Sequence, residues 1–185
     1  MDLIRAFLAI DPGEALRARF AALRQALGEH FPFPTLRWAQ PQDYHLTLVF
    51  LGQVRLGEIV RVHDCVAQVA ATLAPVRYRF DRVCAFPDPR APRVIAALPS
   101  DPQPLKQWQA PLAALLADAG FAIERRAYRP HLSLARWKGR GSCAQEADFA
   151  LDLGAEARAI TLYQSRGGHY LPLFSERCAG GARRE

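Results

Sequence analysis

Two short stretches of this chain pair a histidine with a hydroxyl side chain at the same spacing. HLTL begins at His45 and HLSL begins at His131, in a chain of 185 residues that contains only five histidines. Alternate side chains of a β-strand point to opposite faces, so His45 and Thr47 share one face of their strand. The same alternation puts Ser133 on the face of His131. An imidazole can move a proton, and a hydroxyl beside it can donate a hydrogen bond to an anion.

The repetition of this tetrad carries more weight than either copy. A single histidine in a strand is most often a structural residue. At background composition, however, roughly one unrelated chain in a few thousand with this histidine count would contain two such tetrads. If the two strands face each other across a cleft, two imidazoles flank one bound group. That arrangement suits displacement at phosphorus, in which one group deprotonates the nucleophile and another protonates the leaving oxygen.

The elements that must position the tetrads follow from periodicity and turn residues. Runs rich in β-formers predict strands at 3–10, 45–51, 76–86, 93–98, 121–128, 131–136, 160–165 and 169–174. Apolar residues at helical spacing predict helices over about 13–27, 59–73 and 105–119. Gly52 is expected to end the second strand, and Pro111 to kink the third helix or mark its start. This order of elements predicts an α+β fold with two sheet-and-helix halves.

Length and composition indicate one domain. Half of the residues are hydrophobic, so we expect a single two-lobed domain over 1–178, followed by a disordered tail at 179–185. The opening apolar run is too short to span a membrane and has no features of a secretion signal, so a cytoplasmic protein without a membrane partner is predicted. The four cysteines are spread singly, which predicts reduced thiols rather than a zinc framework or a disulfide scaffold.

The charge of the chain is compatible with a phosphate-containing partner. The formal net charge of +6 favours an anionic partner such as nucleic acid or a phosphate ester. Codon bias explains the same excess, because only two of the 24 basic residues are lysines and the chain is rich in alanine, leucine and proline. The charge therefore supports a phosphate substrate without identifying one, although the planar fork of arginine does suit phosphate.

The residues around both tetrads resemble a known family. YHLTLVFLG and RPHLSLAR are similar to the H-x-[ST]-x signatures of the two-histidine (2H) phosphoesterases, in particular the LigT-like RNA 2′,3′-cyclic phosphodiesterases, or 2′-5′ RNA ligases. The segments RAFLAID, RVIAAL and ITLYQS extend the likeness over almost the full chain. The resemblance implies a bilobal α+β fold, in which two antiparallel-sheet lobes with outer helices and pseudo-twofold symmetry enclose a central cleft lined by both tetrads.

The same resemblance implies an activity. The chain would open RNA 2′,3′-cyclic phosphate ends to 2′-phosphomonoesters without a metal or another cofactor. His45 would be the proton donor to the departing 3′ oxygen, and His131 the proton acceptor that activates water. Thr47 and Ser133 would hold the non-bridging phosphate oxygens. Reversible 2′-5′ ligation needs no new machinery, because a 5′-hydroxyl takes the place of water and the histidines exchange roles between the two directions. A monomer with no obligatory protein partner is expected.

Arg136 and Phe7 are further candidates for substrate binding. Arg136 matches the arginine after the second tetrad in LigT-like proteins, but strict alternation puts it out of phase with His131 and Ser133, so we expect the strand to bend there. Phe7 could stack on a base, although an aromatic residue in a strand more often belongs to the core. Weaker candidates are Tyr44 for stacking, Arg5, Arg93 and Arg129 for phosphate groups, and His169 at the mouth of the cleft.

Other interpretations stay open at the level of sequence. The chain could be a related phosphodiesterase that acts on 2′-5′ oligonucleotides or on small cyclic phosphates. It could also be a non-catalytic RNA-binding module with a basic cleft, although both tetrads are intact. A metallohydrolase is disfavoured, because neither tetrad supplies an acidic ligand beside its histidine.

Overall fold

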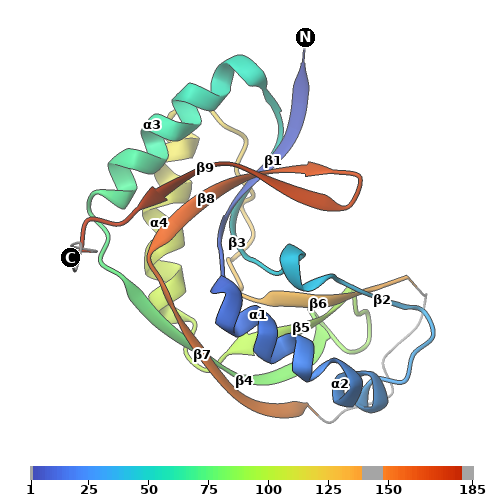
Figure 1. The fold of residues 1–185 in the computed structure, drawn as a ribbon. Helices are drawn as coiled ribbons and strands as arrows, with labels where there is room; N and C mark the ends of the chain where they lie inside the picture. Colours follow the sequence, from blue (N-terminus) through green and yellow to red (C-terminus); the bar gives the residue numbers. More distant parts are fainter. Residues whose placement is uncertain (1, 139–147, 181–185) are drawn as a thin grey trace.

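The computed structural model describes residues 2–138 and 148–180 and shows an α+β fold (Figure 1). The strands are β1 (Leu3–Ile10), β2 (Leu36–Trp38), β3 (Leu46–Arg55), β4 (Val76–Phe86), β5 (Val94–Pro99), β6 (Leu132–Trp137), β7 (Phe149–Ala157), β8 (Ala159–Arg166) and β9 (His169–Arg177). The helices are α1 (Gly13–Ala22), α2 (Arg24–His30), α3 (Ile59–Ala70) and α4 (Gln103–Asp118). Two 3-10 turns, η1 (Pro41–Asp43) and η2 (Leu56–Glu58), precede β3 and α3.

The strands form two antiparallel halves whose ladders meet at one pair of residues. One half has the order β3-β1-β8-β9, and the other has the order β7-β4-β5-β6 with β2 on the far side of β6. Between the halves, the described residues give a single ladder pair, in which Leu46 of β3 lies opposite Leu132 of β6. Each of these leucines follows the histidine of its tetrad, so the two tetrads meet where the halves join.

Helices cover each half and close the core against it. Helices α3 and α4 pack on each other and against β3, β8 and β9, while α1 packs against β7 and η1 (Figure 1). The core includes Phe20 of α1, Phe80 of β4 and Leu116 of α4, which are at most 1% exposed. Full burial of one such side chain contributes about 1.5–3 kcal/mol. The tetrad leucines belong to this core, and they therefore anchor the strands that carry the histidines.

Most of the predicted elements are confirmed. The expected strands at 3–10 and 76–86 coincide with β1 and β4, and those at 93–98, 160–165 and 169–174 correspond to β5, β8 and β9. The first predicted helix is divided into α1 and α2 at Leu23. Its start is held by Asp11, whose carboxylate accepts a hydrogen bond of 2.7 Å from the N–H of Gly13. Pro111 lies inside α4 rather than at its start.

Two predictions about strands are wrong, and two strands, β2 and β7, were not predicted. Gly52 does not end β3, because its φ of +69° lets the chain form a bulge against β1 and continue to Arg55. Segment 121–128 is not a strand; instead it crosses from one half to the other, and the hydroxyl of Tyr128 donates a hydrogen bond to the carbonyl of Thr47. Strand β7 was not predicted, because a glycine and three acidic or small residues around it weaken the strand signal.

The ends and the cysteines fit the sequence interpretation in part. Residue 179, the first of the predicted tail, is described, and its N–H donates a hydrogen bond to the carbonyl of Ala70. Residues 181–185 lie outside the described residues. Cys65, Cys84 and Cys178 are free thiols, and Cys143 lies outside the described ranges. None of the described helices is long and apolar enough to cross a membrane.

Candidate active site

The two tetrads lie side by side on one face of the sheet. Because Leu46 and Leu132 are antiparallel partners, the next positions in this register align His45 with Ser133 and Thr47 with His131. Both leucines are fully buried on the opposite face. The imidazoles and hydroxyls of the tetrads therefore share the other face, as strand alternation predicts.

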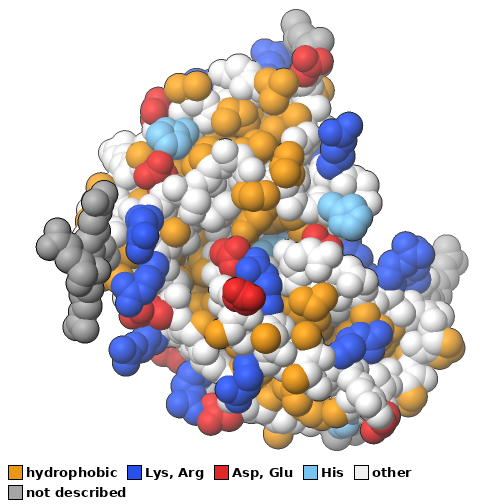
Figure 2. Space-filling view, in the orientation of Figure 1, with side chains coloured by type: hydrophobic (Ala, Val, Ile, Leu, Met, Phe, Trp, Pro, Cys, Tyr) orange, Lys and Arg blue, Asp and Glu red, His pale blue; other side chains and the backbone are white. Residues whose placement is uncertain are grey.

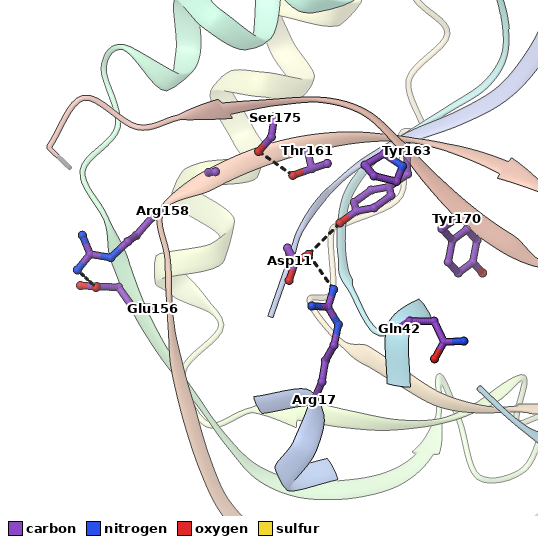
Figure 3. Close-up of a pocket in the computed structure, with 11 residues that line it drawn as sticks. Asp11, Arg17, Gln42, Glu156, Arg158, Thr161, Tyr163, Tyr170 and Ser175 are labelled. Atoms are coloured by element: carbon purple, nitrogen blue, oxygen red, sulfur yellow. Dashed lines mark hydrogen bonds and ion pairs between the residues drawn. The ribbon is translucent and has the colours of Figure 1, made fainter. Parts of the chain in front are cut away.

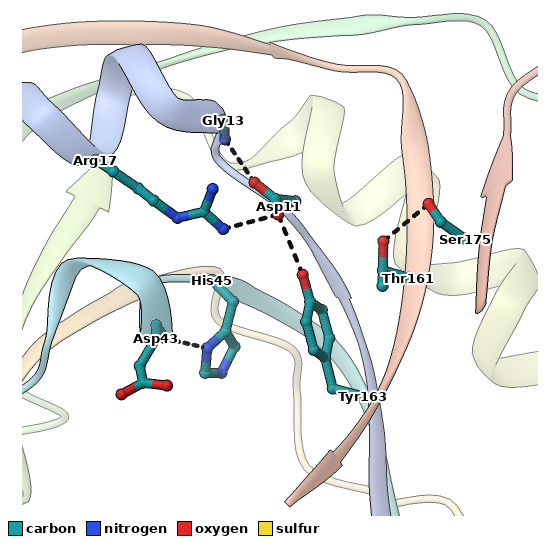
Figure 4. A network of polar contacts seen from close by, with 8 residues as sticks. All are labelled: Asp11, Gly13, Arg17, Asp43, His45, Thr161, Tyr163 and Ser175. Atoms are coloured by element: carbon teal, nitrogen blue, oxygen red, sulfur yellow. Dashed lines mark hydrogen bonds and ion pairs between the residues drawn. The ribbon is translucent and has the colours of Figure 1, made fainter. Parts of the chain in front are cut away.

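Each imidazole is held by the main chain in the same way. The Nδ1 atom of His45 lies 2.7 Å from the carbonyl oxygen of Asp43, and Nδ1 of His131 lies 2.9 Å from the carbonyl oxygen of Arg129. A carbonyl oxygen only accepts hydrogen bonds, so Nδ1 carries a hydrogen in both rings. Figure 4 shows this bond for His45. Nε2 of each ring is therefore the atom that can exchange a proton with a ligand.

The surroundings of both rings favour the neutral imidazole. Burial lowers the pKa of His45 below its usual 6.5, the hydrogen bond to Asp43 opposes this, and the charges of His131 and Arg136 lower the pKa further. Burial also lowers the pKa of His131, the bond to Arg129 opposes this, and the Arg129 guanidinium adds to the lowering. When one imidazole is protonated, its charge disfavours protonation of the other, so the pair favours a state with a single added proton. One donor and one acceptor is the arrangement that acid–base catalysis requires.

Beside the tetrads lies a cavity of about 650 Å³, here called the cleft. Its lining includes Thr47, His131 and Ser133. Neither tetrad hydroxyl has a hydrogen-bond partner that the described residues supply, so both are available to a ligand. Five basic side chains and one acidic side chain also line the cleft, namely Arg93, Arg126, Arg129, Arg136, Lys138 and Glu124. This excess of positive charge favours an anionic ligand.

Arg136 faces the cleft because β6 contains a bulge. Ser133 of β6 pairs with Ala96 of β5, and Ala135 pairs with the neighbouring Ile95. Between these two pairs, β6 therefore contains one more residue than β5. The extra residue reverses the alternation, and the predicted bend is confirmed. Arg136 therefore comes into phase with Ser133, and its guanidinium donates a 2.8 Å hydrogen bond to the hydroxyl of Tyr170 in the other half.

A matching bulge in β3 exposes a residue that sequence analysis missed. Ala9 pairs with Thr47 and Leu8 pairs with Val49, so β3 also advances by two residues for one on β1. The bulge turns Phe50 to the same face as Thr47. Phe50 follows His45 at the same sequence separation as Arg136 follows His131. Phe50 is 51% exposed and lines the cleft. The signal was present as an apolar side chain five residues after His45, but its outward direction depends on the bulge.

Phe7 and Tyr44 do not form a stacking surface for a base. Phe7 is only 3% exposed, and its ring centroid lies 4.7 Å from that of His45. The prediction that Phe7 contacts substrate is therefore wrong; it supports the imidazole from beneath. Tyr44 is 2% exposed and packs edge-on against Phe20 in the core. Tyr170 completes the aromatic surroundings of His45, with ring centroids 4.7 Å apart.

A second cavity, the side pocket, is lined in part by Tyr170 and has a volume of about 420 Å³ (Figure 3). Its two arginines each have an acidic partner. Arg17 bonds Asp11 at 2.7 Å, and Arg158 bonds Glu156. Burial, followed by the charge of Asp11, raises the pKa of Tyr163 to about 12, and its hydroxyl donates to the same carboxylate at 3.3 Å (Figure 4). The side pocket is therefore balanced in charge, unlike the cleft.

The remaining candidates lie in different surroundings. Arg93 and Arg129 line the cleft, whereas Arg5 does not. His63 on α3 bonds Glu176 at 2.6 Å, away from the tetrads. His169 is 76% exposed, and its Nδ1 lies 3.7 Å from the carboxylate of Asp43. Within the described ranges, no three His, Cys, Asp or Glu side chains are grouped closely enough to hold a metal ion. Figure 2 shows basic and acidic side chains interspersed over the lower half of the face in view.

Comparison with known proteins gives consistent matches. A family model described as LigT like phosphoesterase matches residues 10–96. A Bacillus subtilis (strain 168) protein named RNA 2′,3′-cyclic phosphodiesterase is 31% identical over 130 residues, which cover 69% of this chain and 71% of the relative. A protein of the same name from Methanothermobacter thermautotrophicus is 30% identical over 136 residues, which cover 74% of this chain and 72% of the relative.

Solved structures agree with the predicted architecture. A protein from Thermus thermophilus superposes with a TM-score of 0.80 at 24% identity, covering 96% of this chain and 100% of the other. E. coli LigT complexed with 3′-AMP superposes with a TM-score of 0.77 at 23% identity, covering 96% of this chain and 99% of the other. These matches confirm the fold that the sequence resemblance implied.

Proposed function

Because this chain belongs to the LigT-like 2H phosphoesterase family, we propose that it is an RNA 2′,3′-cyclic phosphodiesterase. Relatives at about 30% identity are named for this activity. The observation that carries the proposal is the pair of imidazoles, each fixed through Nδ1 by a main-chain carbonyl. One of them, His131, lines a cleft together with both tetrad hydroxyls. The product is a 2′-phosphomonoester.

The geometry supports an in-line mechanism with two proton transfers. Nε2 of His131 accepts a proton from water, and the water oxygen forms a bond to phosphorus. The bond from phosphorus to the 3′ oxygen breaks, and Nε2 of His45 donates a proton to that oxygen. Thr47, Ser133 and Arg136 donate hydrogen bonds to the non-bridging oxygens, which gain negative charge in the transition state. None of these steps requires a metal ion.

The same site could join RNA ends through a 2′-5′ linkage. A 5′-hydroxyl would then attack phosphorus in place of water, with the same proton acceptor and donor. When the linkage is cleaved, the 3′ oxygen attacks phosphorus and the two histidines exchange roles. The volume of the cleft is about 650 Å³, and five basic side chains line it, which suits an anionic RNA end. Ligation therefore remains part of the proposal as a secondary activity.

The product of a cyclic nucleotide in excess EDTA tests the proposed activity directly. We expect hydrolysis of a nucleoside 2′,3′-cyclic phosphate to proceed without added metal, because the two imidazoles supply both proton transfers. Phosphorus NMR of the product should give the signal of a 2′-phosphomonoester. A 3′-phosphate would show that the donor and acceptor are assigned to the wrong oxygens. Tight RNA binding without turnover of any cyclic phosphate would favour a binding module instead.

Phe50 is predicted to stack on a base of the RNA. Its ring is exposed in the cleft and lies 6.0 Å from that of the buried Phe7. Base stacking on an aromatic ring contributes about 1–3 kcal/mol, so Phe50→Ala should raise KM for an oligonucleotide by about 5–150-fold, with a smaller change in kcat. Phe50→Trp should keep the low KM. The matched control is Leu171→Ala on β9, which removes an exposed apolar side chain outside the cleft lining.

A further inference from the structure

The two half-sites, meaning each tetrad with the residues that flank it, share the features that hold the imidazole and its proton. In each half, Nδ1 is bonded to the carbonyl two residues before the histidine, a hydroxyl follows two residues later, and a bulge comes next. The proposed mechanism nevertheless needs one imidazole to begin as the donor and the other as the acceptor. Something outside these shared features must decide which imidazole carries the proton.

The side chains two residues before the histidines break the symmetry. Asp43 precedes His45 and Arg129 precedes His131, so an anion and a cation occupy equivalent positions. The Asp43 side chain is only 10% exposed, and its carboxylate lies 3.7 Å from Nδ1 of His169. The guanidinium carbon of Arg129 lies 4.5 Å from the centroid of the Phe86 ring. The Arg129 guanidinium is therefore held over Phe86, and the Asp43 carboxylate belongs to the residue whose carbonyl bonds Nδ1 of His45.

Phe86 connects Arg129 to the second imidazole. The rings of Phe86 and His131 are stacked, with centroids 4.4 Å apart and planes 28° apart. Arg129 also donates a hydrogen bond of 3.3 Å to the carbonyl of Pro87. These contacts keep its positive charge on the side of His131. At the first half-site the rings of Phe7 and Tyr170 contact His45, but no described arginine stacks on either ring.

We propose that Asp43 and Arg129 assign the roles of the two histidines, by keeping the shared proton on His45 and away from His131. This inference rests on the proposed function. Both are positioning residues, because they act through the imidazoles and not on the substrate. An anion beside an imidazole favours the protonated ring, and a cation disfavours it.

The other charged groups around the imidazoles do not separate the roles in this way. His45 faces Arg136 of β6 and His131 just before it. It also faces the Tyr163 and Tyr170 phenols from β8 and β9, and the uncharged Phe7 from β1. Among these, Asp43 is the one charge that raises the pKa of His45. Arg136 disfavours the protonated ring in the free protein, but it is the guanidinium assigned to the phosphate, whose negative charge offsets it in the complex.

The pH dependence of kcat tests the proposal. Loss of an anion makes His45 lose its proton at lower pH, so Asp43→Asn should move the high-pH limb downward by about half a pH unit. Loss of a cation lets His131 gain a proton at higher pH, so Arg129→Gln should move the low-pH limb upward by a similar amount. Arg129→Lys should restore the original limb. The matched controls Asp81→Asn and Arg77→Gln on β4 change charge outside the cleft lining and should leave both limbs in place.

The salt dependence of these shifts and an NMR titration of the imidazoles test the proposal further. Raising salt from about 0.01 M to about 1 M shortens the screening length from about 30 Å to about 3 Å. The shift in Arg129→Gln should then shrink more than that in Asp43→Asn, since Asp43 is buried. Unchanged limbs in both variants, or a low-pH limb that moves in Asp43→Asn, would overturn the proposal. Proton NMR titration of the imidazoles should show the same directions without substrate, so it tests the role of these residues even if cyclic phosphates are not turned over.

Discussion

Replacing either His45 or His131 with alanine is expected to lower kcat for opening a 2′,3′-cyclic phosphate by about 10²–10⁴-fold. Each variant removes one of the two proton transfers while leaving the phosphate-binding groups in place. The double variant should be little slower than the worse single variant, because groups that act as one unit are not additive. Initial rates on a cyclic nucleotide in EDTA, with folding checked by circular dichroism, measure these effects.

The control for both variants is His63→Ala. His63 is also a histidine with a hydrogen-bond partner, but it lies on α3 and bonds Glu176 away from the cleft. Its loss should leave kcat within about twofold, because surface substitutions outside the site are usually small in effect. If either tetrad variant kept a rate close to that of the unmodified protein, the two-histidine mechanism would be wrong for this chain.

Arg136→Gln is expected to lower kcat by about 10²–10³-fold, the usual cost of losing one donor to a developing oxyanion. Arg136→Lys should recover part of the rate, since it restores the charge but not the planar fork. Rates at saturating substrate distinguish this effect from weaker binding.

Tyr170→Phe is the control that separates phosphate binding from the contact between the halves. It removes the 2.8 Å hydrogen bond from Arg136 but leaves the guanidinium in the cleft. A loss in Tyr170→Phe as large as that in Arg136→Gln would show that the hydrogen bond, and not contact with phosphate, accounts for the effect.

The parts of the site that sequence analysis predicted are those that depend on simple alternation. His45, Thr47, His131 and Ser133 share a face because the four residues of each tetrad alternate regularly. The fold class followed from the order of elements and from the family resemblance. The alternation of side chains along a strand, and the presence of a histidine in both tetrads of a histidine-poor chain, were enough to predict this part of the site.

The parts that were missed depend on departures from alternation. The bulge that turns Phe50 toward the cleft comes from the pairing of β3 with β1, which local sequence does not determine. The bend before Arg136 was predicted, but only because the family resemblance covers that arginine. The sequence admitted both a core and a substrate role for Phe7, and only the buried position beneath His45 decides for the core. The error at 121–128 has a similar cause, because this β-prone segment has no strand to pair with among the described residues.

The single ladder pair of Leu46 and Leu132 has a consequence for movement of the protein. If the two halves rock relative to each other, this pair acts as the pivot, and displacement grows with distance from it. Each imidazole is one residue from the pivot, whereas Phe50 and Arg136 are four residues from it. In such a movement the donor and the acceptor would keep nearly the same separation, while the distance between Phe50 and Arg136 would change.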